Sequence, residues 1–121
     1  MATLKPTLTL TSTDATSDAL NFTITDSLTV GAPTVSLSRL SIATGAASQL
    51  YADAGADGTV YFFLHNTDTT NFIRVKTDAG SNFLVLNAGE FAFMPVDKNE
   101  GLEVQADTAA CVLEYAYWTK S

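Results

Sequence analysis

The residues that most often carry catalytic chemistry are scarce in this chain. It contains a single cysteine, Cys111, and a single histidine, His65. A lone cysteine cannot form an internal disulfide, and a zinc-type centre needs three or four ligands that are usually His or Cys. The sequence therefore excludes a disulfide framework and a histidine metal centre. We also expect no enzymatic activity, because no acid, base and nucleophile occur in a recognisable arrangement.

These two rare residues each have a simple structural interpretation. Cys111 begins the apolar run CVLEYAYW, which is typical of a small buried side chain. His65 comes at the end of the apolar run TVYFFLHN and is followed by TDTTN, whose short polar side chains favour a turn by bonding to the backbone. We therefore predict a turn after His65 and not a catalytic site.

Basic residues are also few. Six lysines and arginines face thirteen acidic residues, which gives a net charge of −7. This sign is wrong for neutralising phosphates, so we expect no nucleic-acid partner. No apolar run approaches the roughly 18 residues that span a bilayer, and the first residues lack the apolar core of a secretion signal. We expect no membrane partner and synthesis in a cytoplasm.

Alternation of apolar and polar residues dominates what remains. Residues 4–11 and 20–30 alternate with period two, and shorter runs of the same kind follow from residue 59 to the end, separated by turn residues. No segment has helical periodicity of ordinary length. The sequence predicts an all-β, single-domain antiparallel β-sandwich over residues 1–121, jelly-roll-like, with about eight or nine short strands. Residues 1–6 are either an extended N-terminal arm or the first strand of the sandwich.

Two segments depart from regular alternation. In residues 35–42 the apolar phase slips by one residue, which predicts a β-bulge near Ser38 and Arg39. Residues 44–59 have no clear period and are predicted to form a surface loop, with at most one helical turn. Within that loop, Asp53 and Asp57 near Gly58 suggest a calcium site, but the residues between the two aspartates cannot act as side-chain ligands. A solvated acidic loop is the simpler interpretation.

Some strands are apolar on both faces and must be covered on both. In the strand near residue 61, Tyr61 and Phe63 accompany a second apolar set, and Phe91 and Phe93 do the same in a later strand. A second sheet covers one face, and another subunit is the simplest cover for the other. The candidate interface residues include these four, the arm and the aromatic end of the last strand; they are Leu4, Lys5, Pro6, Tyr61, Phe63, Phe91, Phe93, Tyr117 and Trp118.

The aromatic residues of the last strand allow another interpretation. Tyr115, Tyr117 and Trp118, together with Tyr61, could stack on sugar rings in a carbohydrate-binding jelly roll. Aromatic residues at a strand end are more often core or subunit contacts. A carbohydrate- or calcium-binding module thus stays open as an alternative.

Three motifs in the second half of the chain carry a family resemblance. They are an N-T-D-x-T-N turn before an alternating strand, an N-A-G-E-F turn into an aromatic strand that ends at Pro95, and an A-D-T-A-A-C turn into a last strand rich in Tyr and Trp. In these motifs the chain resembles the small β-sandwich virion proteins of tailed bacteriophages. The resemblance covers about half of the chain and includes no catalytic residue.

The resemblance implies a structural role in the virion, most plausibly as a capsid decoration or cement protein. Such a protein binds the lattice of the major capsid protein on the outer capsid surface, commonly as a trimer, and needs no cofactor. A tail, neck or fibre-base component is the alternative within the same class. The acidic net charge suits the outside of a capsid better than its DNA-facing side.

Overall fold

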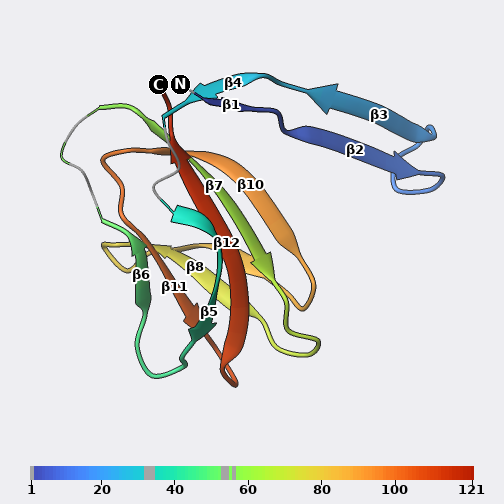
Figure 1. Ribbon diagram of the computed structural model, residues 1–121. Helices are drawn as coiled ribbons and strands as arrows, with labels where there is room; N and C mark the ends of the chain where they lie inside the picture. Colours follow the sequence, from blue (N-terminus) through green and yellow to red (C-terminus); the bar gives the residue numbers. More distant parts are fainter. Residues whose placement is uncertain (1, 32–34, 53–54, 56) are drawn as a thin grey trace.

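The computed structural model of the protein describes residues 2–31, 35–52, 55 and 57–121 (Figure 1). All secondary structure in these residues is antiparallel β-strand, which confirms the predicted all-β class. No helix that could cross a membrane occurs in this part of the chain. The strands are β1 Ala2–Leu4, β2 Thr7–Ser12, β3 Leu20–Thr25, β4 Leu28–Val30, β5 Val35–Ile42, β6 Ser48–Tyr51, β7 Thr59–Asn66, β8 Ile73–Thr77, β9 Asn82–Leu86, β10 Phe91–Asp97, β11 Leu102–Ala106 and β12 Cys111–Thr119.

Eight of these strands form the predicted β-sandwich. One sheet has the order β10-β7-β12-β5, and the other has the order β6-β11-β8-β9. Consecutive strands β5, β6, β7 and β8 alternate between the two sheets, so each connection passes from one sheet to the other. This arrangement makes β10 and β5 the edge strands of the first sheet.

The core lies between the two sheets and is built by strict alternation along each strand. In β7, Val60, Phe62 and Leu64 are fully buried and pack in the core, while the residues between them point to the other face of the sheet. Burying one such large apolar side chain contributes roughly 1.5–3 kcal/mol, so this core supplies most of the stability. The core residues that the strands contribute are Ile42, Leu50, Val60, Phe62, Leu64, Ile73, Val75, Leu86, Leu102, Val104, Ala106, Cys111, Leu113 and Tyr117.

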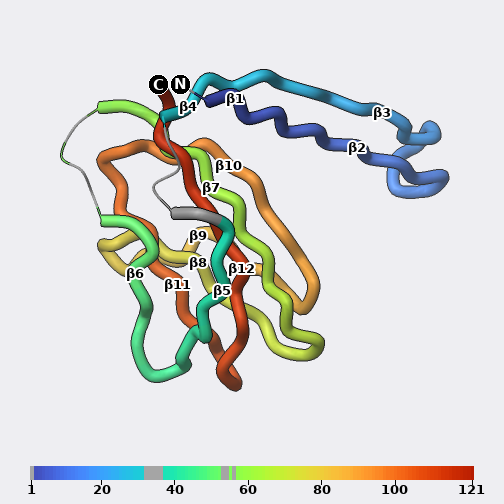
Figure 2. The backbone as a smooth tube through the Cα atoms, viewed as in Figure 1, coloured from blue at the N-terminus to red at the C-terminus, as the bar shows by residue number. Residues whose placement is uncertain are grey.

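Residues 2–30 form an arm outside the sandwich. β2 pairs with β3, and β1 pairs with β4, so residues 2–30 make one two-stranded ribbon that is interrupted at Lys5-Pro6 and at Asp26-Ser27. Figure 2 shows the ribbon leading away from the sandwich, with both chain ends at its root. The interpretation of residues 1–6 as the first strand of the sandwich is therefore wrong. The arm also explains why the described residues hold twelve strands where eight or nine were predicted.

Backbone hydrogen bonds fix the root of the arm to the last strand. The N–H of Gly31 donates to the carbonyl of Thr119 at 2.9 Å, and the N–H of Ser121 donates to the carbonyl of Thr29 at 3.0 Å. Val30, which is buried, also forms a β-bridge with Lys120. The direction in which the arm leaves the sandwich is thus set by the end of β12.

Two local predictions have different outcomes. The pairing of β5 with β12 shifts register between Val35 and Ser38, so the predicted irregularity is present beside Ser38. The predicted loop over residues 44–59 is wrong in part, because Ser48–Tyr51 form strand β6 against β11. Leu50 and Tyr51 of this strand pack on the core. The surrounding Ala, Gly and Asp residues obscure this short strand in the sequence.

Candidate protein interface

The two outer faces of the sandwich differ in their central strands, although Val85 of the edge strand β9, opposite Arg74, is exposed on the more polar face. On the β6-β11-β8-β9 sheet, the outward residues of the central strands are polar: the Lys76 ammonium donates to the Gln105 side-chain carbonyl at 2.6 Å, and Arg74 lies 3.5 Å from Asp107. On the β10-β7-β12-β5 sheet, the outward residues of β7 and β10 are aromatic. A polar face can remain in water, whereas an aromatic one favours a protein partner.

The aromatic face is built by cross-strand pairs. Phe93 lies opposite Phe63, and Pro95 lies opposite Tyr61 in the β10-β7 ladder. The rings of Tyr61 and Phe93 stack with centroids 6.1 Å apart, and Trp118 of β12 lies opposite Tyr61 on the other side. These pairs stiffen the surface, because each aromatic side chain is held by a neighbour on the same face.

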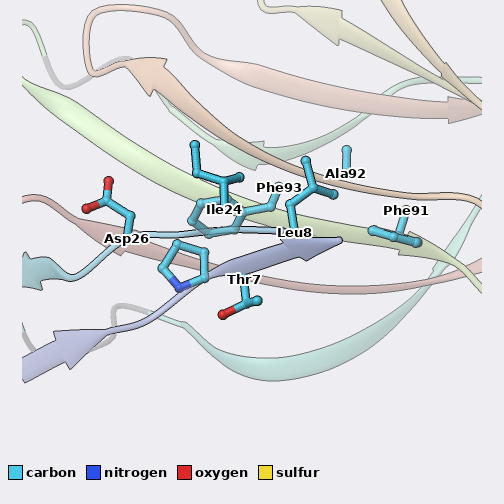
Figure 3. A pocket seen from close by; sticks show the side chains of 8 residues that line it. Thr7, Leu8, Ile24, Asp26, Phe91, Ala92 and Phe93 are labelled. Carbon is cyan, nitrogen blue, oxygen red and sulfur yellow. The ribbon is translucent and has the colours of Figure 1, made fainter. Parts of the chain in front are cut away.

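A groove lies between this face and the arm, and we call it the elbow groove. It has a volume of about 380 Å³ and is lined by Pro6, Thr7, Leu8, Ile24, Asp26, Phe91, Ala92 and Phe93. Figure 3 shows Leu8 and Ile24 on the arm strands and Phe91 and Phe93 on β10. Asp26 is the one charged residue of the lining, so the groove suits an apolar occupant.

One face of the arm continues the apolar lining away from the sandwich. Leu8 lies opposite Ile24, and Leu10 lies opposite Phe22, so these four side chains share one face of the ribbon. Their exposed fractions are 42% for Leu8, Leu10 and Phe22 and 61% for Ile24. No part of the described chain covers this face beyond the elbow groove.

The opposite face of the arm is made of threonine. Thr7 lies opposite Thr25 and Thr9 lies opposite Thr23, with hydroxyl oxygens 3.3 and 3.0 Å apart. Such pairs contribute roughly 0.2–1 kcal/mol each and leave the face hydrated. The arm is therefore amphipathic, with one face suited to water and one suited to a partner.

The exposed apolar surface is large for a chain of this size. With about 200 Å² for each large apolar residue when fully exposed, the four arm residues expose roughly 370 Å². Phe91 and Phe93, which are 65% and 37% exposed, add about 200 Å² beside the same groove. The largest apolar patch of a typical monomer is about 300–600 Å², so this surface is at the upper end of that range.

The predicted interface residues divide into three groups. Phe91 and Phe93 are exposed at the elbow groove, and Pro6 lines it. Phe63 and Trp118 are half-buried on the aromatic face, while Leu4 and Lys5 lie in the arm, half-buried and exposed respectively. Tyr61 and Tyr117 are 7% and 8% exposed, so they supply little accessible surface. Tyr117 packs in the core against Phe62 and Tyr51, which corrects its assignment to the interface.

Four exposed apolar residues of the arm were not among the predicted interface residues. Leu8, Leu10, Phe22 and Ile24 were interpreted as the inward face of sandwich strands, because alternation alone does not distinguish a buried face from an unpartnered one. The sequence gives one signal that could have separated them. The residues that alternate with them along the two strands are threonines apart from Asn21, and no basic residue occurs between Lys5 and Arg39.

The surroundings of His65 form an open, shallow surface. Its Nδ1 atom lies 3.9 Å from Glu114 Oε1, and Arg39 Nε lies 3.3 Å from the other oxygen of the same carboxylate. The three residues belong to adjacent strands β7, β12 and β5, and their side chains lie on the outer face of the first sheet. The charges of Arg39 and Glu114 cancel, so this ion pair adds no net charge to this end of the aromatic face.

The segment after His65 is a turn, as predicted, and its organising residue is Asn66. The fully buried Asn66 amide donates from Nδ2 to the carbonyls of Asn71, Leu86 and Asn87 at 2.9, 3.0 and 3.2 Å. Its Oδ1 atom accepts from the N–H of Asp68 at 3.0 Å. One side chain thereby joins this turn to the turn between β9 and β10.

Asp68 completes the same turn. The backbone N–H groups of Asn71 and Thr70 donate to Asp68 Oδ2 at 2.6 and 2.9 Å, and these bonds hold the pKa of the Asp68 carboxyl below its usual value. The Asp68 carboxylate is therefore already hydrogen-bonded within the turn. This geometry assigns a structural task to the polar residues beside His65.

The residues considered for calcium or sugar binding are not brought together. Asp53 lies outside the described residues, and the Asp57 carboxylate accepts a hydrogen bond from the Asn99 amide at 3.1 Å. In the described part of the chain, no three His, Cys, Asp or Glu side chains are grouped to hold a metal ion. Tyr117 packs in the core, whereas Trp118 follows it on the opposite face of β12, so the predicted sugar-stacking set is divided.

No protein-family model matches the chain, and no curated protein is significantly similar to it in sequence.

Proposed function

We propose that this protein is a non-enzymatic structural component of a tailed-bacteriophage virion, most plausibly a capsid decoration protein that binds and stabilises the coat lattice. The observation that carries the proposal is the exposed apolar surface formed by the arm and the elbow groove. A surface of this size and chemistry is suited to burial against protein. The sequence resemblance to phage virion proteins supports the choice of assembly.

The chemistry of the grooves also favours an assembly role over catalysis. The elbow groove is lined almost entirely by apolar groups, and the surface near His65 uses its polar groups in ion pairs and turns. Catalytic sites instead combine a concave pocket with polar groups aimed at one point. A decoration protein needs extended contact area and does not need such a pocket.

We also infer that the sandwich is of the jelly-roll type. Counting only its eight strands from β5 to β12, one sheet has the order 1-8-3-6 and the other has the order 2-7-4-5. In each sheet, strands from the two ends of the segment lie side by side, as expected when a long hairpin is wound into two sheets of Greek-key connectivity. Jelly rolls are frequent among viral capsid proteins, which agrees with the proposed role.

The proposal is tested by locating the protein in intact particles. Gold-labelled antibody against the chain should lie over the whole capsid surface of a decorated virion. Label confined to one vertex or to the tail would instead identify a tail, neck or fibre-base component. Absence of label from purified particles, with the epitope shown to be accessible, would overturn both virion roles.

A binding experiment separates decoration from mere presence. The purified protein should co-sediment with expanded empty capsids that lack it and should raise their melting temperature, because it braces neighbouring coat subunits. Each added contact is repeated over the symmetric lattice, so even weak individual contacts produce a measurable shift. Unchanged melting at saturating protein would contradict a stabilising role.

A further inference from the structure

The elbow groove and one face of the arm are both apolar and could pack together. Within one chain, however, the outer half of the arm does not reach the groove. Strand β2 contains six residues and extends about 20 Å, twice the roughly 10 Å that separates packed sheets. The root hydrogen bonds to β12 direct this length away from the sandwich (Figure 1). Leu10 and Phe22 consequently lie beyond the elbow groove of their own chain, which their neighbours Leu8 and Ile24 line.

We propose that the arm of a second copy of this chain occupies the elbow groove. Leu8, Leu10, Phe22 and Ile24 of one copy would pack on Phe91 and Phe93 of the next, so that copies associate by exchanging arms. This contact uses the same surface that supports the proposed virion role, but it requires no coat protein and can be tested separately.

The exposed area is of the size that such an association needs. The arm and groove residues together expose about 570 Å² of apolar residue surface, against roughly 800 Å² buried per partner in a standard interface. Each copy would bury both its arm and its groove. Threonines at the margins of the arm and the half-buried Phe63 and Trp118 supply further contact at the rim.

Charge favours a second copy at this surface. The chain carries a net charge of −7, so copies repel one another over most of their surfaces. The four apolar arm residues and the two phenylalanines form the contact without a charged group, and Asp26 lies at the root end of the groove. On the adjacent face Glu114 is paired with Arg39, and Asp97 lies at the far end of β10, five or more residues beyond Phe91 and Ala92. The apolar residues of the contact therefore meet with the acidic groups of this region at its margins.

The arm itself benefits from the exchange. A two-stranded ribbon is marginally stable alone in water, and three or more strands or a packing surface are normally required. At the tip, the Ser12 hydroxyl accepts from the N–H groups of Asp14 and Ala15, which shapes the turn but adds no apolar cover. Seating the ribbon on a neighbour provides that cover.

A pair of arm variants gives the first test. Ile24→Asp places a carboxylate on the apolar face, and Thr23→Asp places the same group at the next position on the threonine face. Ile24→Asp should weaken self-association by about 100-fold or more, because the carboxylate would be desolvated without a partner, while Thr23→Asp should leave it within about threefold. Sedimentation equilibrium measures the association, and near-UV circular dichroism confirms that both variants are folded. Equal effects of the two variants, or a strictly monomeric parent chain, would overturn the proposal.

Crosslinking between different chains gives the second test and fixes the partner surfaces. Leu10→Cys in a size-tagged chain is refolded together with Phe91→Cys in an untagged chain and then oxidised; Cys111 is buried and does not compete. Arm exchange predicts a mixed-size crosslinked product, which Thr9→Cys in place of Leu10→Cys should not give. A Leu10→Cys chain that crosslinks only to itself would mean that arms pair with arms and would overturn the proposal.

The outcomes separate this contact from the virion role. A chain that is monomeric in solution yet labels the whole capsid would reject arm exchange and leave the decoration function in place. An arm-exchanged oligomer that is absent from particles would do the reverse.

Discussion

At the scale of single residues, the buried amide of Asn66 supplies hydrogen bonds to the backbone that regular secondary structure supplies elsewhere. It is the one fully buried polar side chain among the described residues, and its Nδ2 group serves three backbone carbonyls. An unsatisfied buried carbonyl costs about 1–3 kcal/mol. The cost of losing this side chain therefore exceeds that of a typical surface substitution.

Substitution of Asn66 by alanine tests this assignment. Asn66→Ala should lower the free energy of unfolding by about 3 kcal/mol, because the carbonyls of Asn71 and Leu86 lose this donor, while the Asn87 carbonyl keeps the N–H of Glu90. The corresponding fall in melting temperature is about 10 °C. Urea unfolding measures the change. Asn87→Ala is the control, since this side chain is exposed and only its backbone accepts the bond; equal destabilisation by both variants would contradict the account.

Cys111 makes a second prediction at this scale. Its side chain is 1% exposed and its thiol donates to the carbonyl of Ala109 at 3.4 Å. Burial raises the pKa of the Cys111 thiol, and the nearby negative charge of Asp68 raises it further. Because the thiolate is the reactive form, alkylation at pH 8 should be slow in the native protein and fast in denaturant. Rapid labelling of the native thiol would contradict the assigned burial.

The sequence predicts the turn after His65 but not the role of Asn66. Short polar residues in succession are a local signal, and it was sufficient. The partners of Asn66, in contrast, lie five to twenty-one positions away along the chain. Such bonds depend on how β9 and β10 are placed beside β7, which local composition does not contain.

At the scale of elements, the arm is a strand pair whose register is well defined although its apolar face is uncovered. Threonine pairs and the turn at Ser12 stabilise strands β2 and β3. The break at Lys5-Pro6 separates this pair from β1 at the root of the arm. Few side chains connect the arm to the core. The sandwich should therefore not depend on it.

Removal of the arm tests this independence. A chain that begins at Leu28 keeps Val30 and its bridge to Lys120. Its melting temperature should stay within about 5 °C of the full chain when both are compared as monomers, because the core residues are retained. Circular dichroism during heating measures this. Loss of a cooperative transition would show that the arm is part of the folding unit.

Alternation predicted the strands of the arm and of the sandwich equally well. It failed to assign residues 2–30 to a separate ribbon, because Leu8 and Leu10 repeat with the same period whether they face a core or solvent. Strand β6 was missed for a related reason. Its four residues are too few to show a period, and its pairing with β11 comes from residues more than fifty positions away.

At the scale of the whole molecule, an acidic surface surrounds a nearly neutral apolar region. Association through that region must overcome repulsion between copies, each with a net charge of −7. Raising the salt concentration from about 0.01 M to about 1 M shortens the Debye length from about 30 Å to about 3 Å. Screening should thus act mainly on the repulsion.

Salt should accordingly strengthen self-association of this protein. Sedimentation equilibrium over that range should show a tighter association constant at higher salt, since the contact is apolar and the repelled charges lie outside it. The Ile24→Asp variant is the control, because it should remain dissociated throughout. Weaker association at high salt would indicate that ion pairs hold the copies together.

The sandwich as a whole was predictable because composition and turn spacing suffice for fold class. Phe91 and Phe93 were predicted to lie at an interface, and both are exposed. The assembly itself stays a prediction, because local sequence patterns do not specify which molecule packs on a surface.

The ladder that joins Phe93, Tyr61 and Trp118 has an optical consequence. Trp118 is the only tryptophan of the chain, and it is half-buried on the same face as the elbow groove. Its fluorescence emission therefore reports the polarity of that surface from a single site. A blue shift as the protein is concentrated, or on addition of capsids, would reveal coverage of the face in real time, with no dye attached to the protein.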